Sequence, residues 1–251
     1  MTSGCILCFW LTRRRAQAAG WDVSHIDFAL PMAFICGAIG MKLLALLFFD
    51  RLLLFALPLA AIPGLWIYCR RKGLSVLKLA DLMAPPLLLW LAVLRIGCFF
   101  AGCCWGDVVI GGGLLKDAVR LQVDTLPSVN ALLSFTALEF PAESFAAHQH
   151  AALGLIVSPA SCSLPVLPTQ LYESIELVGL YTGSICLERT PRREGILMSM
   201  MLGAYSILRF ALEFLRADNA PLVSSLTGNQ GVCIALLGFS IWRWRSLHRE
   251  K

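Results

Sequence analysis

Arginines that lie within apolar runs are the first candidates for a functional site in this sequence. Arg95 lies near the end of one apolar run, which closes on small residues and cysteines up to Asp107. A second run carries four polar residues at spacings of four, four and three, which places them on one face of a helix. This polar stripe consists of Tyr205, Arg209, Glu213 and Arg216. Ionisable side chains at membrane depth are costly, so by default they mark a site.

A third group of polar residues, Pro168–Glu173, begins another apolar run. Gln170 and Tyr172 have the donors and acceptors that suit a lipid headgroup region. Glu173 and Glu176 fall at the expected start of a helix, where carboxylates interact favourably with the macrodipole. Taken alone, this group is typical of a helix start with an interfacial tyrosine.

The chemistry that these groups suit together is the binding of an anion. Guanidinium groups offer fixed, paired donors to phosphate, which lysine does not. At the outer leaflet of a membrane the natural anion is a phospholipid headgroup. The alternative is structural: Arg209 and Glu213 neutralise each other and form a network between helices with Arg95. The residue types alone leave both interpretations open.

The composition indicates a polytopic membrane protein that forms a single integral domain over residues 1–251. The chain is 58% hydrophobic and 15% charged, and its mean hydropathy is +0.73, well above the needs of a soluble core. The first dozen residues are too short to span, and no cleavage site typical of a signal peptide follows an apolar run. The ten cysteines are too scattered for a disulfide framework.

Six apolar runs predict an all-α bundle of transmembrane helices, because a span needs about 20 apolar residues, or about 17 at the short end. The predicted spans are residues 27–49, 52–68, 83–101, 171–187, 196–215 and 229–242. We expect Pro85 and Pro86 in the first turn of the third span. The insertion 107–167 is predicted to lie outside the membrane. Its segments 130–138 and 151–157 are too short to span and favour interfacial or re-entrant pieces.

Four clusters of basic residues predict the orientation. They are Arg13–Arg15, Arg70–Lys72, Arg189–Arg193 and Arg243–Lys251. With both termini in the cytoplasm, all four fall on the inner side, as the positive-inside rule requires. The third span then runs outward, so Arg95 lies in its outer half. The polar stripe lies at the same depth, and the predicted site faces the outer leaflet.

Several ordered motifs resemble the prolipoprotein diacylglyceryl transferases of bacteria. The segment Arg95–Gly106 is similar to the R-I-G-C-F-x-A-G-C-C-x-G motif of cysteine-rich relatives, and Ala80–Pro85 to an A-D-x-x-A-P motif. Pro168–Glu173 matches the end of H-P-x-Q-L-Y-E, the polar stripe follows Y-x-x-x-R-x-x-x-E-F-x-R, and Gly228–Gln230 looks like the family's G-Q segment. The resemblance covers roughly residues 75–107 and 165–235.

The resemblance implies transfer of the diacylglyceryl group of phosphatidylglycerol to the lipobox cysteine thiol of a preprolipoprotein, at the bacterial inner membrane. It implies catalytic roles for Arg95 and Arg209, which would hold the phosphate, and for Tyr205, which would hydrogen-bond the headgroup. The implied substrate-binding residues are Gly97, Cys98, Gly106, Gln170, Tyr172, Glu213 and Arg216. We expect no cofactor, no metal and no nucleic-acid partner.

Departures from the family pattern raise the question of the proton acceptor for the thiol. The stretch 55–64 has no histidine where the family has a histidine and paired glycines, and Leu167 replaces the histidine before Pro168. The loop residues His148 and His150, water and the lipid phosphate stay open as acceptors. The alternatives to an enzyme are a non-catalytic phospholipid-binding paralogue and, less favoured, a transporter.

The cysteines are interpreted as packing residues and family signature. Cys103 and Cys104 lie on the predicted outer side, where a disulfide with Cys162 would be the alternative. Cys5 and Cys8 form a C-x-x-C without the second pair that a zinc site needs.

Overall fold

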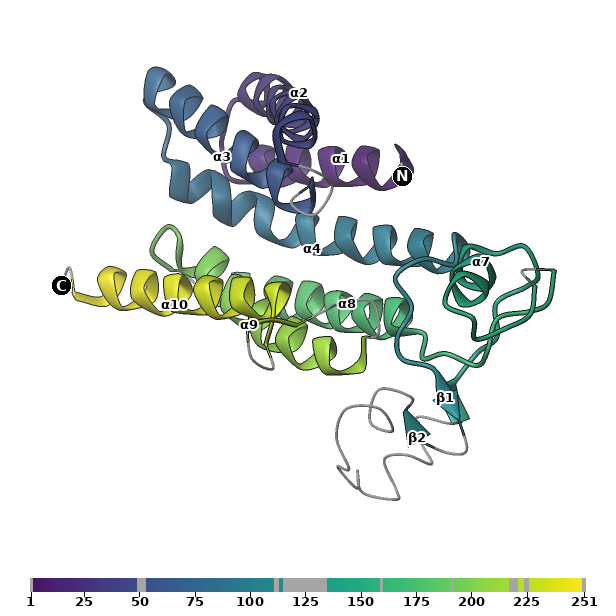
Figure 1. The fold of residues 1–251 in the computed structure, drawn as a ribbon. Helices are drawn as coiled ribbons and strands as arrows, with labels where there is room; N and C mark the ends of the chain where they lie inside the picture. The colour runs from purple at the N-terminus through teal and green to yellow at the C-terminus, as the bar shows by residue number, and fades with distance from the viewer. Residues whose placement is uncertain are drawn as a thin grey trace. The chain divides into compact units, whose positions relative to one another are not determined.

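The structure is a computed structural model of the chain, in which helices predominate (Figure 1). It describes residues 2–48, 53–110, 113–114, 135–158, 160–190, 192–216, 221–223 and 226–249. The described chain forms two compact units. Unit 1 comprises residues 88–183 and 199–251, and unit 2 comprises residues 2–87 and 184–198. The single integral domain stays a prediction.

Unit 2 is built from the N-terminal helices. They are α1 (Thr2–Ala18), α2 (Val23–Phe48), α3 (Leu53–Lys72) and the first half of α4 (Val76–Phe100). A small apolar core joins them, made of Ala16, Ile26, Cys69, Leu79 and Leu82. Helix α3 is continuous, so the stretch 55–64 forms regular helix despite Pro58 and Pro63.

Pro85 and Pro86 lie inside α4 and not in its first turn, which corrects the sequence-based placement. A proline within a helix removes the hydrogen bond to the carbonyl four residues earlier, here those of Asp81 and Leu82. Arg15 supplies the missing donors: its Nε donates to Leu82 O at 2.9 Å and its Nη2 to Asp81 O at 3.5 Å. The helix therefore continues through both prolines, because a side chain of α1 satisfies the carbonyls that they leave without partners.

The Ala80–Pro85 motif caps another helix. Asp81 accepts hydrogen bonds from the backbone N–H groups of Gly195 at 2.6 Å and Met198 at 2.7 Å. These donors lie immediately before α9 (Ile196–Leu212) and in its first turn, where no carbonyl of the helix itself is available. The aspartate therefore fixes the start of the helix that carries Tyr205 and Arg209.

Unit 1 contains the second half of α4 and the C-terminal helices, and Figure 1 shows α8, α9 and α10 as neighbouring ribbons. Helix α8 is Thr169–Glu188, α9 continues into a 3₁₀ turn at Glu213–Leu215, and α10 is Gly228–Arg249. Two short hairpins pair β1 (Val109–Ile110) with β2 (Gly113–Leu114) and β3 (Pro221–Val223) with β4 (Leu226–Thr227).

Close packing between α9 and α10 depends on a glycine. A Cβ atom at Gly203 would lie 2.7 Å from the Ser240 Oγ. Small residues let two helix backbones approach without a side chain between them, which is how helices associate in membranes.

The predicted membrane character is confirmed at the level of a mostly helical architecture with apolar helices. Each of the six predicted spans coincides over most of its described residues with one helix: α2, α3, α4, α8, α9 with its 3₁₀ turn, or α10. Within the described residues, three segments have the length and hydropathy to cross a membrane: 23–40, 76–100 and 196–215. The number of six spans stays a prediction.

The insertion 107–167 has a core of its own within unit 1. Helix α7 (Phe145–Ala152) packs there, and the core consists of Trp105, Val108, Phe140, Ala146 and Val166. The predicted short segment 151–157 is the end of α7 and the turn after it. The other, 130–138, lies outside the described residues up to position 134.

Candidate functional site

Glu173 links the two arginines that the sequence singled out. Its Oε2 lies 2.9 Å from Arg95 Nε, and its Oε1 lies 3.9 Å from Arg209 Nε. The glutamate comes from the first turns of α8, Arg95 from the end of α4 and Arg209 from α9. Because the Glu173 side chain is only 4% exposed, water screens these ion pairs little. The three helices are thus joined by charge at one point of unit 1.

A second carboxylate orients Arg209 from the opposite end of its guanidinium group. Glu213, one turn further along, accepts a hydrogen bond from Arg209 Nη1 at 2.7 Å. The same carboxylate accepts from Thr227 Oγ1 at 2.7 Å and from Asn229 Nδ2 at 3.2 Å. Glu213 is buried, and each of these bonds has an ionised acceptor, which makes it stronger than a neutral one.

The Gly228–Gln230 motif therefore meets the polar stripe. Gln230 Oε1 accepts a hydrogen bond from the Thr227 N–H at 3.0 Å, and the Gln230 N–H donates to Thr227 Oγ1 at 3.3 Å. This reciprocal pair satisfies backbone and side-chain groups at the start of α10. It holds the Thr227 hydroxyl in position to donate to Glu213.

Tyr205 and Arg216 complete the stripe. Tyr205 is half-buried, and the charges of Glu173, Arg209 and Arg95 act on its hydroxyl. Arg216 is buried and interacts with Cys104 through its charge and a hydrogen bond. The predicted residues Arg95, Tyr205, Arg209 and Glu213 thus lie in one cluster, with Arg216 at its edge toward the cysteines.

Gly106 occupies a place where only glycine fits. Its N–H donates to Leu167 O at 2.8 Å, and a Cβ atom there would lie 2.7 Å from Leu167 Cβ and 2.8 Å from Leu215 O. Asp107 N–H also donates to Leu215 O at 2.8 Å, and Gly106 forms an isolated bridge with Arg216. The glycine therefore allows the segment after α4 to lie against the segment that carries Arg216.

The residues that begin α8 hold the same segment from the other side. Gln170 Nε2 donates to Cys103 O at 2.7 Å, and Thr169 Oγ1 donates to Cys104 O at 3.2 Å. Tyr172 shares a short hydrogen bond with Thr136 of the insertion. Gly97 lies on an exposed face of α4, and a Cβ atom there would meet open space as far as the described residues outside its own helix are concerned. Gln170 and Tyr172 thus act on neighbouring backbone and loop.

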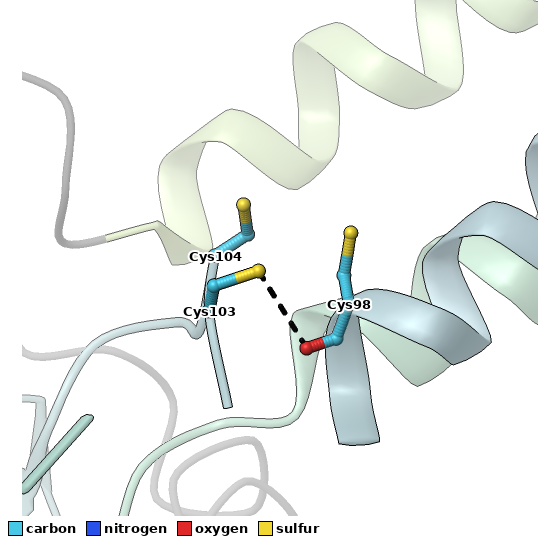
Figure 2. A group of neighbouring side chains, drawn as sticks. All are labelled: Cys98, Cys103 and Cys104. Atoms are coloured by element: carbon cyan, nitrogen blue, oxygen red, sulfur yellow. Dashed lines mark hydrogen bonds between the residues drawn. The ribbon is translucent and has the colours of Figure 1, made fainter. Parts of the chain in front are cut away.

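Three cysteines gather beside the arginines (Figure 2). Cys98 lies on α4, Cys103 and Cys104 follow the helix end, and the three Sγ atoms lie within 4.8 Å of one another. A hydrogen bond with Cys98, aided by the charges of Arg216 and Arg95, lowers the pKa of Cys104 to about 5 against the opposing effect of burial. Burial, followed by the neighbouring Cys104, raises the pKa of Cys103.

The histidines considered as proton acceptors lie apart from this chemistry. His150 is fully buried: its Nδ1 accepts a hydrogen bond from the Leu164 N–H at 3.1 Å, and its ring stacks edge-on against Trp105. Burial lowers the pKa of this imidazole, so it is a packed, neutral core residue and not the solvated loop histidine expected. His148 is exposed and lies 3.1 Å from Glu143.

The disulfide considered for the outer cysteines is not formed. All ten cysteines are free, and Cys162 is exposed. Cys103 and Cys104 have their nearest sulfur neighbours in each other and in Cys98.

Glu173 is the residue of this cluster that the sequence-based interpretation missed, because its carboxylate was assigned to the helix macrodipole. The signal was present in the sequence: Glu173 closes the Pro168–Glu173 motif. A buried carboxylate needs a cation as its partner, and the sequence had already indicated Arg95 and Arg209 as buried cations.

Comparison with known proteins agrees with these motifs. The family model described as prolipoprotein diacylglyceryl transferase matches residues 1–245. A phosphatidylglycerol–prolipoprotein diacylglyceryl transferase of Clostridium tetani is 26% identical over 96% of this chain and 90% of its own length. A second such protein, from Clostridium perfringens, is 26% identical over 93% and 83%, and one from Dehalococcoides mccartyi is 28% identical over 84% and 72%. With a family match that runs from the first residue almost to the last, and with four of its five motifs within unit 1, this chain belongs to the prolipoprotein diacylglyceryl transferase family.

Proposed function

We propose that this protein transfers the diacylglyceryl group of phosphatidylglycerol to the lipobox cysteine thiol of a preprolipoprotein. The reaction takes place in the bacterial inner membrane, at a site open to the outer leaflet, with both termini in the cytoplasm and six helices spanning the bilayer. The support comes from the family, whose relatives carry this activity in their names, and from the cluster around Glu173.

The observation that carries the proposal is the pairing of Arg95 and Arg209 on one buried carboxylate. Glu173 holds both guanidinium groups through their Nε atoms, which leaves Nη donors to approach the two sides of one phosphate. A pair of guanidinium groups in a site that excludes water binds a phosphate diester strongly and with a fixed orientation. Tyr205, on whose hydroxyl the charges of both arginines act, donates a hydrogen bond to the headgroup.

The reaction is a displacement at carbon. The thiol sulfur attacks the glyceryl carbon, a C–S bond forms, and the C–O bond to phosphorus breaks with its electron pair leaving on oxygen. The thiol proton passes to an acceptor, and glycerol phosphate departs. Negative charge grows on the leaving phosphate as the bond breaks, so Arg95 and Arg209 stabilise the transition state more than the ground state.

The alternative function is that of a non-catalytic phospholipid-binding paralogue. It is favoured by the stretch 55–64, which has no histidine and forms part of the continuous helix α3. Such a protein would keep the arginine pair and bind phosphatidylglycerol, but it would transfer nothing to a thiol.

Complementation separates the two functions. The intact gene is expressed in cells depleted of their own transferase, and radiolabelled lipid is followed onto a model lipoprotein. We expect labelling by the wild-type protein and its loss in Arg209→Ala, with membrane insertion unchanged. The matched control is Arg189→Ala, an exposed arginine of unit 2, which should label normally. Absence of labelling by the wild type would refute the transferase, and normal labelling by Arg209→Ala would remove this residue from the site.

A further inference from the structure

We propose that Cys98, Cys103 and Cys104 form a zinc site whose fourth position is open to the thiol that is to be alkylated. The proposal rests on the proposed function and deepens it, because it assigns the activation of the thiol, for which the histidines of the described chain provide no suitable group. It concerns three side chains that the phosphate chemistry leaves without a role.

The geometry supports a metal site. The three Sγ atoms lie within 4.8 Å of one another, and Figure 2 shows the Cys103 sulfur directed toward the end of α4, where Cys98 lies. Zinc–sulfur bonds of about 2.3 Å at tetrahedral angles place the sulfur atoms roughly 3.8 Å apart. Rotations about the cysteine side chains and a shift of up to about 1 Å therefore suffice to close the cluster on a zinc ion. Metal binding would replace the weak hydrogen bond from Cys103 Sγ to Cys98 O, at 3.7 Å, and the hydrogen bond between Cys98 and Cys104.

The backbone that carries Cys103 and Cys104 has an unusual conformation. Gly102 and Cys104 both have left-handed conformations, with φ of 66° and 62°. Glycine adopts this conformation readily, but a cysteine does so at an energetic cost that the surrounding structure must offset. The hydrogen bonds from Gln170 to Cys103 O and from Thr169 to Cys104 O hold this turn in place.

The charge of the surroundings also fits. Three thiolates and one Zn²⁺ carry a net charge of −1, which is costly to bury without a cation. Arg216 and Arg95 both act on Cys104 by their charge, so cations flank the cluster. Thiolate ligands select soft and borderline metals such as zinc over magnesium or calcium.

The open fourth position gives the site its role. Zinc sites with three protein ligands keep one position for water or substrate, and a thiol that coordinates there is deprotonated. A lipobox cysteine binding in this place would release its proton to solvent and present a thiolate. Cys98 lies three residues after Arg95 on α4, one turn away on the same face, so the nucleophile and the phosphate would be held next to each other. The thioether product is a weaker ligand and dissociates.

The first experiment measures the metal itself. The full chain is purified in detergent under reducing conditions, incubated with Zn²⁺, desalted and assayed for zinc by mass spectrometry. We expect about one zinc per chain, its loss in the triple variant Cys98→Ser/Cys103→Ser/Cys104→Ser, and its retention in the control Cys162→Ser. Equal zinc in the wild type and the triple variant would overturn the proposal. So would a disulfide among the three cysteines, detected by alkylation and peptide mapping of the protein as isolated from membranes.

The second experiment tests the open position. Co²⁺ replaces zinc, and its visible and sulfur-to-metal absorption bands are recorded before and after addition of a lipobox peptide or the same peptide with serine for cysteine. We expect the cysteine peptide alone to raise the sulfur-to-metal band by about a third, as three thiolates become four. An unchanged spectrum would overturn the assignment of the fourth position to the substrate.

The two experiments distinguish this inference from the proposed function. Zinc and peptide binding without lipid transfer would leave the metal site in place and remove the transferase. Lipid transfer by a protein free of zinc would support the transferase and remove the metal site.

Discussion

Replacing Glu213 by glutamine tests whether the orientation of Arg209 matters for the reaction. The substitution conserves size and keeps one carbonyl oxygen for the Thr227 hydroxyl and the Asn229 amide, which donate at 2.7 and 3.2 Å. It places an NH₂ group, or an uncharged oxygen, 2.7 Å from Arg209 Nη1. The ion pair is lost, while the packing around the buried side chain is retained.

The size of the effect follows from the bonds that change. A hydrogen bond between charged groups in a buried place contributes about 1.5–3 kcal/mol, and the bond from Arg209 to Glu213 is the one removed. If that energy is lost from the transition state, where Arg209 must face the leaving phosphate, the transfer rate falls roughly 10- to 100-fold, since about 1.4 kcal/mol corresponds to a factor of ten. Because Glu173 still pairs with Arg95, we expect the fold to persist.

The assay is transfer of radiolabelled diacylglycerol from phosphatidylglycerol to a lipobox peptide, with thermal unfolding in detergent measured on the same preparation. The control is Glu143→Gln, which makes the same chemical change at an exposed glutamate that pairs with exposed His148 at 3.1 Å; exposed pairs contribute about 0–1 kcal/mol. We expect the control to change the rate less than about twofold. A Glu213→Gln protein that is folded and as active as the wild type would refute the orienting role of Glu213.

Three further substitutions test the framework of the site by thermal unfolding in detergent. Arg15→Ala removes the donors to the carbonyls of α4 and should lower the free energy of unfolding by about 1–3 kcal/mol. The control Arg14→Ala, at an exposed arginine, should change it little. Equal losses of stability in the two variants would contradict the role given to Arg15 at the two prolines. Gly106→Ala places a Cβ 2.7 Å from Leu167 Cβ and should reduce the yield of folded protein far more than Gly179→Ala, which has open space. His150 is buried with a lowered pKa, so below about pH 6.5 the unfolded chain takes up a proton that the folded protein resists, and stability falls as the pH falls. His150→Asn should reduce this loss, measured as the difference in melting temperature between about pH 7.5 and pH 5.5; an undiminished difference would exclude His150 as its source.

The sequence predicted the arginine cluster because its members obey helical spacing. Tyr205, Arg209 and Glu213 lie one turn apart, and the cost of charge in an apolar run required partners nearby. What the sequence could not show is which of two glutamates on α8, Glu173 or Glu176, faces the arginines. They lie three residues apart, so both fit the same broad face of a helix, and only the packing of α8 against α4 and α9 decides between them.

Predictions from local sequence patterns were also wrong or incomplete where a residue distant in the chain determines the local structure. Two adjacent prolines are typical of a first helical turn, and that is where the sequence placed Pro85 and Pro86. In the structure α4 begins at Val76 and continues through both prolines. Arg15, about 70 positions earlier in the chain, donates to the Asp81 and Leu82 carbonyls that the prolines leave without a helical partner. The packing of the insertion 107–167 was not predicted for a similar reason: its core brings Trp105 and Val108 together with Phe140, Ala146 and Val166, and no periodicity links residues so far apart.

The backbone hydrogen bonds at Gly106 and Asp107 have a consequence for how the insertion 107–167 tolerates changes in length. Gly106 N–H to Leu167 O and Leu167 N–H to Asp107 O fasten the two ends of the insertion to each other, and Asp107 N–H to Leu215 O fastens them to the segment of Arg216. The chain therefore enters and leaves the insertion at two hydrogen-bonded segments that lie side by side. Because these two ends are fastened together, a change in the length of the chain between them costs little entropy and leaves the segment of Arg216 in place.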